Sequence, residues 1–329
     1  MSLKSFLTKS RTLLSGDYRE VERNAIAARN ERVIRKYKGK GDIYAVLRLY
    51  SDEAGLFSFF LKALGGISYC RQHGYIPVID MQTKENIFFD AKERKRKNVW
   101  ECFFEQPAGV SFADVKGKKN VIVLENPRMP EGSMLQLLQQ ERLRKYWHKA
   151  FVKYIHYTEP VKEEISRYEK AFAARKKWLG VLARGTDYLS VGVGHAVQPD
   201  RDTLLAKIRS VKEDYGCDGI FLATEDEDIL DMIKESFGDE VMVLEQKRYR
   251  GKQEQKLGQK ADYKKDAIAM NITYLAALDY LSRCSCLIAA NTGGTTGVYI
   301  MSEGFEYTHC WFLGTMGSTD ERTLDIDKL

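Results

Sequence analysis

The sequence predicts an α/β protein in which two doubly wound, Rossmann-like domains face a cleft, preceded by a helical arm. Strand and helix patterns alternate along two stretches, residues 41–160 and 161–329. In the second stretch, three apolar strands run into polar, glycine-bearing tips, and a helical pattern follows each of them. Because the carboxyl ends of parallel strands meet at one edge of a sheet, these tips predict a single crevice of nucleotide size.

Residues 1–40 are expected to form a basic helical arm. They carry eleven Lys and Arg against four Asp and Glu, whereas the whole 329-residue chain has a net charge of +6. The remainder of the chain is therefore close to neutral, which excludes a broad nucleic-acid surface. The arm is either a solvated helical extension that packs on the body, as its alternating charges indicate, or a peripheral contact with anionic lipid.

The first domain is expected to begin with a βαβ unit. Ile43–Leu49 and Ile76–Asp80 have the composition of strands. Between them, Leu56–His73 has a helical pattern that Gly74 closes as a C-cap. A further strand is predicted at residues 121–124.

The rest of this domain combines a loop, an aromatic segment and helices. A basic run at residues 92–97 predicts a surface loop. Residues 98–107 are rich in aromatic side chains, which either pack in the core, the simpler interpretation, or recognise an acceptor. A helical pattern then continues from about Glu131 to about Lys177, with an interruption near residues 158–160.

The second domain is expected to start with a strand at residues 178–183. A long helix at about residues 265–283 precedes a last strand at Cys286. Before that helix, Gln246–Lys265 is basic and poor in apolar residues, and it forms either a plain loop or a lid over a substrate. The other expected elements are helices at residues 202–215 and 226–237 and strands at residues 219–223 and 240–244.

Arg184 is the first candidate for chemistry, because it follows the strand at residues 178–183 directly. Two doubly wound domains around a cleft are the GT-B architecture, in which nucleotide-sugar transferases work. A guanidinium there fits a diphosphate and stabilises the charge that grows on it as a glycosidic bond breaks. The alternative is a structural pair between Arg184 and Asp187, since this spacing is common.

The segment at residues 291–297 is the second candidate. Its glycines allow a phosphate to approach the backbone closely, and a following helix would point its N-terminus there. A plain tight turn explains the same residues. The segment is neither a Walker loop nor a dinucleotide fingerprint. The residues expected to bind the donor here are Asn291, Thr292, Gly293, Gly294 and Thr295.

Thr224, Glu225 and Asp226 follow the strand at residues 219–223. Their oxygens could bind a ribose or a base. They could also form an N-cap with acids in the first helical turn, and this second interpretation is slightly favoured. His195 is expected either to face the cleft as a base or phosphate donor, or to lie on the surface. No Asp-x-Asp or His/Cys cluster has metal-ligand spacing, so no metal is expected.

The six cysteines include no C-x-x-C pair, so reduced and mostly buried thiols are expected. No apolar run approaches the ~18 residues of a membrane span, and the N-terminus lacks a signal-peptide core. A cytoplasmic location is therefore expected, with peripheral membrane contact through the basic arm as an alternative.

Three segments together resemble motifs of the fucosyltransferase superfamily that includes the α1,6-fucosyltransferases, the Nod-factor fucosyltransferases and the protein O-fucosyltransferases. They are Val181 to Tyr188, Leu222 to Glu227, and Tyr280 to Ile288 with the small-residue segment at residues 291–297. The resemblance covers about residues 178–303, which is under half of the chain.

The resemblance implies a GT-B fold, a GDP-fucose donor, inversion at the anomeric carbon and no required cofactor or metal. It places Arg184 and Gly185 at the donor, with Arg184 on the β-phosphate, and Thr292 and Gly293 near the diphosphate. Gly185 stands where the α1,6 enzymes have a second Arg, and their proposed base falls near Gly192. An Asp that relatives use on guanine is replaced by Ala, and Asp279 lies two residues further on.

The main hypothesis is an inverting glycosyltransferase that moves a sugar, fucose by resemblance, to a glycan or lipid-linked glycan acceptor. Arg184 stabilises the leaving group, and Asp187 either orients Arg184 or acts as general base. Two alternatives stay open. One is a non-catalytic nucleotide-sugar-binding protein on a degenerate transferase scaffold, and the other is a transferase for another nucleotide sugar.

Overall fold

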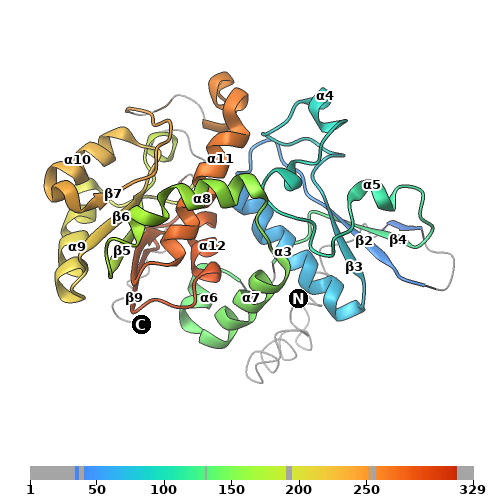
Figure 1. Ribbon diagram of the computed structural model, residues 1–329, viewed down its shortest axis with the longest axis horizontal. Coiled ribbons are helices and arrows are strands. Elements are labelled where there is room, and N and C mark those ends of the chain that lie inside the picture. Colours follow the sequence, from blue (N-terminus) through green and yellow to red (C-terminus); the bar gives the residue numbers. More distant parts are fainter. Residues whose placement is uncertain are drawn as a thin grey trace. The chain divides into compact units, whose positions relative to one another are not determined.

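The computed structural model describes residues 34–36, 41–129, 132–189, 195–251, 253 and 257–316. The chain divides into two compact units, Met1–Thr158 (unit 1) and Glu159–Leu329 (unit 2). Each unit contains its own β-sheet with helices packed on it (Figure 1). This arrangement confirms the predicted α/β fold class.

The unit 1 sheet has the strand order β1-β4-β2-β3, in which β2 pairs in parallel with both β3 and β4. Residues 34–36 form β1, which pairs antiparallel with β4. The predicted helical arm is therefore wrong at these three residues, because their strand conformation comes from pairing with β4, which no local pattern shows. The rest of the arm lies outside the described residues. The strands are β1 Ile34–Lys36, β2 Tyr44–Arg48, β3 Ile76–Asp80 and β4 Val121–Glu125.

The unit 1 helices begin with the one that connects β2 to β3. This helix ends at Gly74, whose φ of 67° lies in the left-handed region that a residue without Cβ adopts freely. The predicted βαβ unit is thus confirmed. The helices are α3 Leu56–His73, α4 Ala91–Arg94, η1 Val99–Cys102, α5 Phe112–Val115, α6 Met134–Gln139 and α7 Glu141–Tyr154.

Aromatic side chains form much of the unit 1 core. Trp100, Phe103 and Phe104 are fully buried, and the rings of Trp100 and Phe104 lie 4.5 Å apart between centroids. The Phe60 ring packs against Phe104 at 5.9 Å. The aromatic segment at residues 98–107 therefore packs in the core.

Arg48 connects the carboxyl ends of all three parallel strands of unit 1. Its Nε lies 2.9 Å from Oδ2 of Asp80, and its Nη1 lies 2.9 Å from Oε1 of Glu125. Burial lowers the pKa of Arg48, but the two carboxylates outweigh it and raise that pKa overall. The second oxygen of Asp80 accepts hydrogen bonds from the amides of Gln82 and Thr83, so the same carboxylate also shapes the chain after β3.

The unit 2 sheet is fully parallel, with the order β7-β6-β5-β8-β9. Every residue of β5, β6 and β8 is buried, which explains the continuous apolar runs that made them predictable. The edge strand β9 was not predicted, because it mixes polar and aromatic residues. The strands are β5 Trp178–Leu182, β6 Gly219–Ala223, β7 Val241–Met242, β8 Cys286–Ala290 and β9 Tyr307–Trp311.

Helices cover both faces of the unit 2 sheet, as in a doubly wound fold (Figure 1). Ile208 of α9 and Ile233 of α10 share one core cluster with Val181 of β5. On the other face, the Tyr280 ring of α11 lies 5.4 Å from Phe221 of β6. The helices are α8 Glu159–Phe172, η2 Thr186–Leu189, α9 Arg201–Asp214, α10 Glu227–Phe237, η3 Gly238–Glu240, η4 Leu257–Gln259, α11 Ala261–Ser282 and α12 Gly293–Met301.

All six cysteines are free thiols and buried, as predicted. Among the described residues, no helix is long and apolar enough to cross a membrane.

Candidate functional site

The candidate site lies where the strand order of unit 2 reverses. The chain runs outward from β5 through β6 to β7, and then returns to place β8 on the other side of β5. Arg184 follows β5, Thr224 follows β6 and Asn291 follows β8, so all three leave the same edge of the sheet. In open α/β sheets, ligands bind at the carboxyl edge where the order reverses.

Arg184 occupies the centre of this edge and its side chain is 19% exposed. Its Nε lies 3.2 Å from Oε2 of Glu225, and its Nη2 lies 3.9 Å from Oδ1 of Asp187. The guanidinium also lies over the Tyr188 ring, 4.6 Å from the centroid. The structure therefore brings Arg184, Asp187 and Glu225 together, as the sequence predicted.

The charges around Arg184 keep it protonated. Burial lowers the pKa of Arg184, but the charge of Glu225, with contributions from tyrosines and Asp187, outweighs burial and raises it. Burial also raises the pKa of Glu225, against the opposing effect of Arg184. The guanidinium is thus a permanent cation in a partly desolvated place, where it interacts strongly with an anion.

The pair between Arg184 and Glu225 is close but poorly aligned. Nε of Arg184 and Oε2 of Glu225 are both buried, and neither has a hydrogen-bond partner among the described residues. A buried donor without an acceptor costs about 1–3 kcal/mol, so such groups in native proteins call for an explanation. A ligand oxygen at this edge would supply the acceptor that Arg184 lacks.

Asp226 fixes the backbone that carries Arg184. Its Oδ1 accepts the amides of Asp228 and Ile229 as the N-cap of α10, which confirms the capping interpretation of residues 224–226. Its Oδ2 accepts the amide of Thr186 at 3.0 Å. A Cβ on Gly185 would collide with this same Oδ2, so the position requires glycine.

Thr186 is a functional candidate that the sequence analysis missed. Its φ is 49°, a left-handed conformation that a β-branched residue adopts at a cost of about 1–3 kcal/mol. The residue is fully buried, and its hydroxyl donates to Oε1 of Glu225 at 3.2 Å. The turn after β5 is thus held in a strained shape by its contacts, with Arg184 at its start.

Asp187 is buried and bonded on both oxygens. Oδ2 accepts the amide of Leu257 at 3.1 Å, and Oδ1, at 3.3 Å, shares the Thr186 hydroxyl donor with Oε1 of Glu225. Asp187 therefore ties the segment before α11 to the end of β5. In this geometry Asp187 lies 3.9 Å from Arg184, and each of its oxygens already accepts a hydrogen bond from the protein.

The predicted loop at residues 291–297 is in large part a helix, since α12 already begins at Gly293. Thr292 is its N-cap, and the Thr292 hydroxyl accepts the amide of Thr295 at 3.2 Å. A helix offers no acceptor of its own to its first amides, so Gly293 and Gly294 present theirs at the edge. A Cβ on Gly294 would collide with the hydroxyl of Tyr274, so α12 lies very close to α11 here.

Thr224, His195 and Asp279 differ in how they relate to this site. The Thr224 hydroxyl is buried and accepts the amide of Asp226 at 3.1 Å. His195 stacks on the Tyr188 ring at 4.3 Å, on the aromatic group that also contacts Arg184. Asp279 lies elsewhere, because it pairs with Arg283 at the C-terminal end of α11. Arg283 contacts Phe172, which stacks on Trp178 at the opposite end of β5.

Two tyrosines of α11, Tyr263 and Tyr274, complete the surroundings of Arg184. Burial raises the pKa of both, and the positive charge of Arg184 opposes the increase. They are 11 residues apart, which is about three helical turns, so they lie on one face of the helix. That spacing is visible in the sequence and could have identified them.

Among the described residues, no group of three or more His, Cys, Asp or Glu could hold a metal ion. The charge that the site offers an anion comes from Arg184 and from the N-terminus of α12.

Comparisons with known proteins support the fold. No protein-family model and no curated protein matches the sequence. The solved structure of a variant of Arabidopsis thaliana FUT1 in complex with GDP has a TM-score of 0.50 at 11% identity, over 90% of this chain and 75% of that chain. The Bradyrhizobium fucosyltransferase NodZ has a TM-score of 0.47 at 14% identity, over 79% of this chain and 93% of that chain. POFUT1 in complex with GDP-fucose has a TM-score of 0.44 at 11% identity, over 83% and 98%.

This chain has a GT-B fucosyltransferase-like fold, as the structural similarity to the plant enzyme shows. The predicted α/β, GT-B-like fold class is therefore confirmed. At this level of identity the similarity concerns the fold, and activity has to be argued from the site.

Proposed function

We propose that this protein is a fucosyltransferase-like glycosyltransferase that binds a nucleoside-diphosphate sugar at the carboxyl edge of the unit 2 sheet. One observation carries the proposal: Arg184 is a partly buried cation at the point where the strand order reverses, and its Nε faces Glu225 at 3.2 Å without an aligned hydrogen bond. The fold supports a diphosphate as the ligand, since the similar plant enzyme was solved with GDP.

In this proposal Arg184 neutralises the charge that develops on the leaving diphosphate, which stabilises the transition state more than the bound donor. The amides of Gly293 and Gly294 at the α12 N-terminus bind the phosphate oxygens. Thr292, Thr295 and Asn291 shape that turn, and Thr224 and Asp226 hold the neighbouring one. The cation and the helix N-terminus take the part that a metal plays in other transferases, so transfer is expected to proceed without one.

Asp187 and Glu225 are positioning residues in this proposal. Oδ2 of Asp187 accepts the amide of Leu257, Oε1 of Glu225 accepts the amide of Gly185, and Oε2 of Glu225 faces Nε of Arg184. His195 stacks on the Tyr188 ring, which also contacts Arg184, and His195 is the candidate for proton transfer. Inversion at the anomeric carbon and a glycan or lipid-linked glycan acceptor complete the proposal.

A transferase for another nucleotide sugar is the second candidate function. One observation favours it: Asp279, the nearest carboxylate to the guanine-reading position of the resembled enzymes, lies at the opposite end of β5 from Arg184. Other residues would then bind the base of the nucleotide, and guanine is no longer the base that the site residues specifically favour.

Calorimetric titration with GDP, UDP, CMP and ADP, with and without magnesium, tests both candidates. Wild type is expected to bind one nucleoside diphosphate without metal, and Arg184→Ala to weaken that binding about 10- to 100-fold. Arg283→Ala is the matched control, because it removes an ion-paired arginine from the other end of the sheet. Equal loss in both variants, or unchanged binding in Arg184→Ala, would contradict the proposed role of Arg184.

Transfer is tested separately with the nucleotide sugar of the preferred base and a glycan panel. Binding of the nucleotide without transfer or donor hydrolysis would favour a non-catalytic nucleotide-sugar-binding protein. Preference for UDP, CMP or ADP would keep the transferase fold and discard the GDP-fucose donor.

A further inference from the structure

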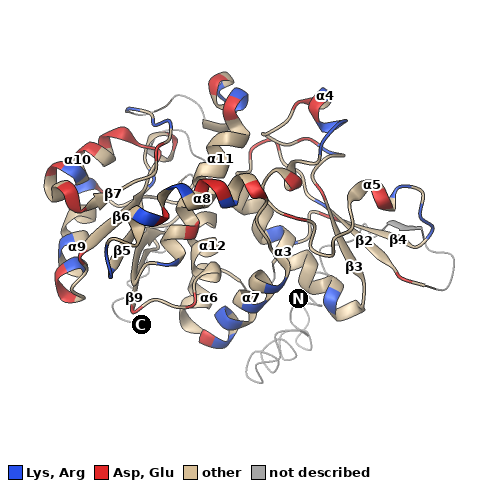
Figure 2. Ribbon diagram, viewed as in Figure 1, with Lys and Arg blue, Asp and Glu red and all other residues tan. Residues whose placement is uncertain are grey.

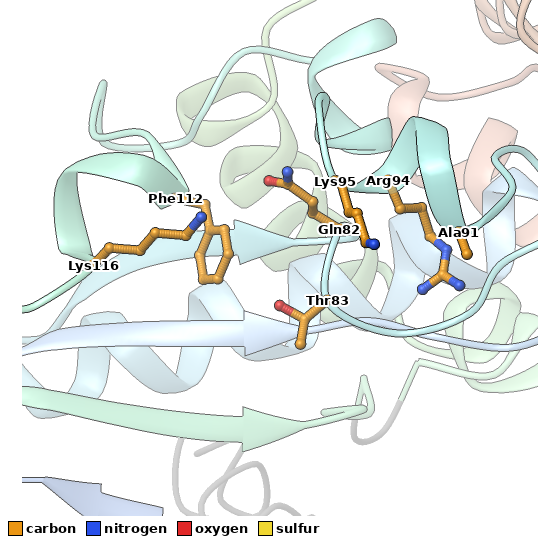
Figure 3. A pocket seen from close by; sticks show the side chains of 7 residues that line it. All are labelled: Gln82, Thr83, Ala91, Arg94, Lys95, Phe112 and Lys116. Carbon is orange, nitrogen blue, oxygen red and sulfur yellow. The ribbon is translucent and has the colours of Figure 1, made fainter.

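Unit 1 contains a basic cavity that plays no part in the proposed donor site. Its volume is about 420 Å³, within the ~300–1,000 Å³ of pockets that bind small molecules. Gln82 and Thr83 line it from the chain after β3, Arg94 and Lys95 from α4 and its end, and Phe112 and Lys116 from α5 and its end (Figure 3).

The positive charge of this cavity is only partly compensated by neighbouring acids, since Arg94 interacts electrostatically with Asp90. Arg94, Lys95 and Lys116 form no ion pair within the described part of the chain, although Lys and Arg are frequent on α4 and after α5 (Figure 2). The nearby acids serve the helix ends instead. Asp90 accepts the amides of Lys92 and Glu93 in the capping box of α4, and Asp114 closes the capping box of α5 with Ser111.

Some polar groups of the cavity are partly buried or fixed by the backbone, while Lys95 and Lys116 are exposed. Nε of Arg94 is buried and has no hydrogen-bond partner among the described residues. The backbone amides of Gln82 and Thr83 are fixed by Asp80, so their side chains are presented from a rigid turn. Such preformed donors lower the entropy cost of binding an anion.

An aromatic ring adds an apolar surface to these donors. Lys116 lies over the Phe112 ring, with Nζ 5.6 Å from its centroid (Figure 3). A ring face next to cations and an amide suits a sugar, whose C–H face packs on the ring while its charged substituent meets the cations. The small volume of the cavity and the near-neutral body argue against an extended polynucleotide.

We propose that this cavity binds an anionic saccharide, a sugar ring that carries a phosphate or carboxylate group. The Arg94 guanidinium and the Lys95 and Lys116 ammonium groups bind the anion, Gln82 and Thr83 donate to its oxygens, and Phe112 packs on the ring. The inference goes beyond the proposed donor site and does not depend on it, because every residue that carries it belongs to unit 1.

The test is calorimetric titration of the full chain with glucose 6-phosphate, glucuronate, glucose and inorganic phosphate at two salt concentrations. Wild type is expected to bind both anionic sugars more tightly than glucose, and less tightly at high salt. Arg94→Gln is expected to weaken that binding about tenfold or more. Phe112→Leu is expected to weaken glucose 6-phosphate binding and to leave inorganic phosphate unchanged.

Lys92→Gln and Arg96→Gln are the matched controls, because they remove charges from the same basic run but do not line the cavity. Equal binding of glucose, an equal loss in these controls, or tighter binding of a single-stranded oligonucleotide would overturn the proposal. Arg184→Ala separates the two sites: it should weaken nucleotide binding about 10- to 100-fold and leave the binding of the anionic sugars unchanged. Loss of the sugars in that variant would place them in unit 2 and refute the cavity assignment, whatever becomes of the donor proposal.

Discussion

The position of the Asp226 carboxylate requires a glycine at position 185. The carboxylate of Asp226 lies where a Cβ at position 185 would be, and it binds the amide of Thr186 while it caps α10. A second arginine at position 185, as in the resembled α1,6 enzymes, is therefore incompatible with this turn. The site relies on one arginine because its backbone is locked against the start of the next helix.

Gly185→Ala is the direct test of that relationship. The new methyl group should displace the Asp226 carboxylate and destabilise unit 2 by about 2–3 kcal/mol, measured by chemical denaturation. Gly55→Ala is the control, since a Cβ there meets nothing within 4 Å and φ is −74°. Additive effects of Gly185→Ala and Asp226→Ala in a double-mutant cycle would disprove the coupling.

Gly294→Ala should act through a single atom, the hydroxyl of Tyr274. The other neighbours of the new Cβ, Leu182 and Leu278, lie at ordinary contact distances of 3.5 and 3.6 Å. The expected cost is about 1–3 kcal/mol in wild type. In a Tyr274→Phe background the same change should be neutral or stabilising, because alanine favours a helix over glycine. Thermal unfolding of the four proteins decides, and a cost that persists without the hydroxyl would be the contrary result.

Asp228 is expected to titrate below the ordinary carboxyl pKa of 3.8. The amide of Gly251 lowers its pKa first, and Arg250 and Arg201 add to this against the opposing effect of burial. A lowered folded-state pKa means that the stabilisation is present at neutral pH and is lost as the pH falls through that value.

The chemical shift of the Gly251 amide, followed by NMR from pH 7 downward, should report this titration. Its midpoint should lie below 3.8, and Asp228→Asn should remove the transition while Asp202→Asn leaves it. A midpoint above 3.8 would reverse the sign of the effect.

Arg48→Met should destabilise unit 1 strongly, because it leaves the buried Asp80 and the half-buried Glu125 without their cation. Removal of one partner from a buried pair costs about 3–5 kcal/mol. Lys177→Met breaks a more exposed pair with Glu306 and should cost less than about 1 kcal/mol. Denaturant unfolding compares the two variants, and equal costs would show that Arg48 is not what holds the strand ends.

Much of the fold was predictable because local signals agreed with the tertiary structure. The boundaries of α3 follow from its helical pattern and from Gly74, which supplies the left-handed cap. The strand β9 was missed because its stability comes from pairing with β8, which no local pattern shows. Similarly, the glycines of α12 looked like a loop, but a helix that lies against Tyr274 requires one of them.

The site was predictable in part for the same reason. Arg184, Glu225 and Asp187 stand at strand ends, and parallel pairing brings such ends together. The roles of Thr186 and Tyr274 depend on a strained turn and on the packing of α11, which are properties of the assembled unit. Asp279 was assigned by its place in the resemblance, and the direction of α11 carries it to the opposite end of the sheet.

Because of the strand order of unit 2, nucleotide binding would show whether the whole unit has folded. Arg184, Thr224 and Gly293 come together only after β5 has paired with β6 and with β8, which is more than 60 residues further along the chain. A fragment that ends before α12 lacks the site altogether, so a bound nucleotide would stabilise the completed unit and none of its precursors. A higher nucleotide concentration would then increase the folded fraction of the whole unit. A molecule that has lost β8 would not bind the nucleotide and would not be stabilised by it.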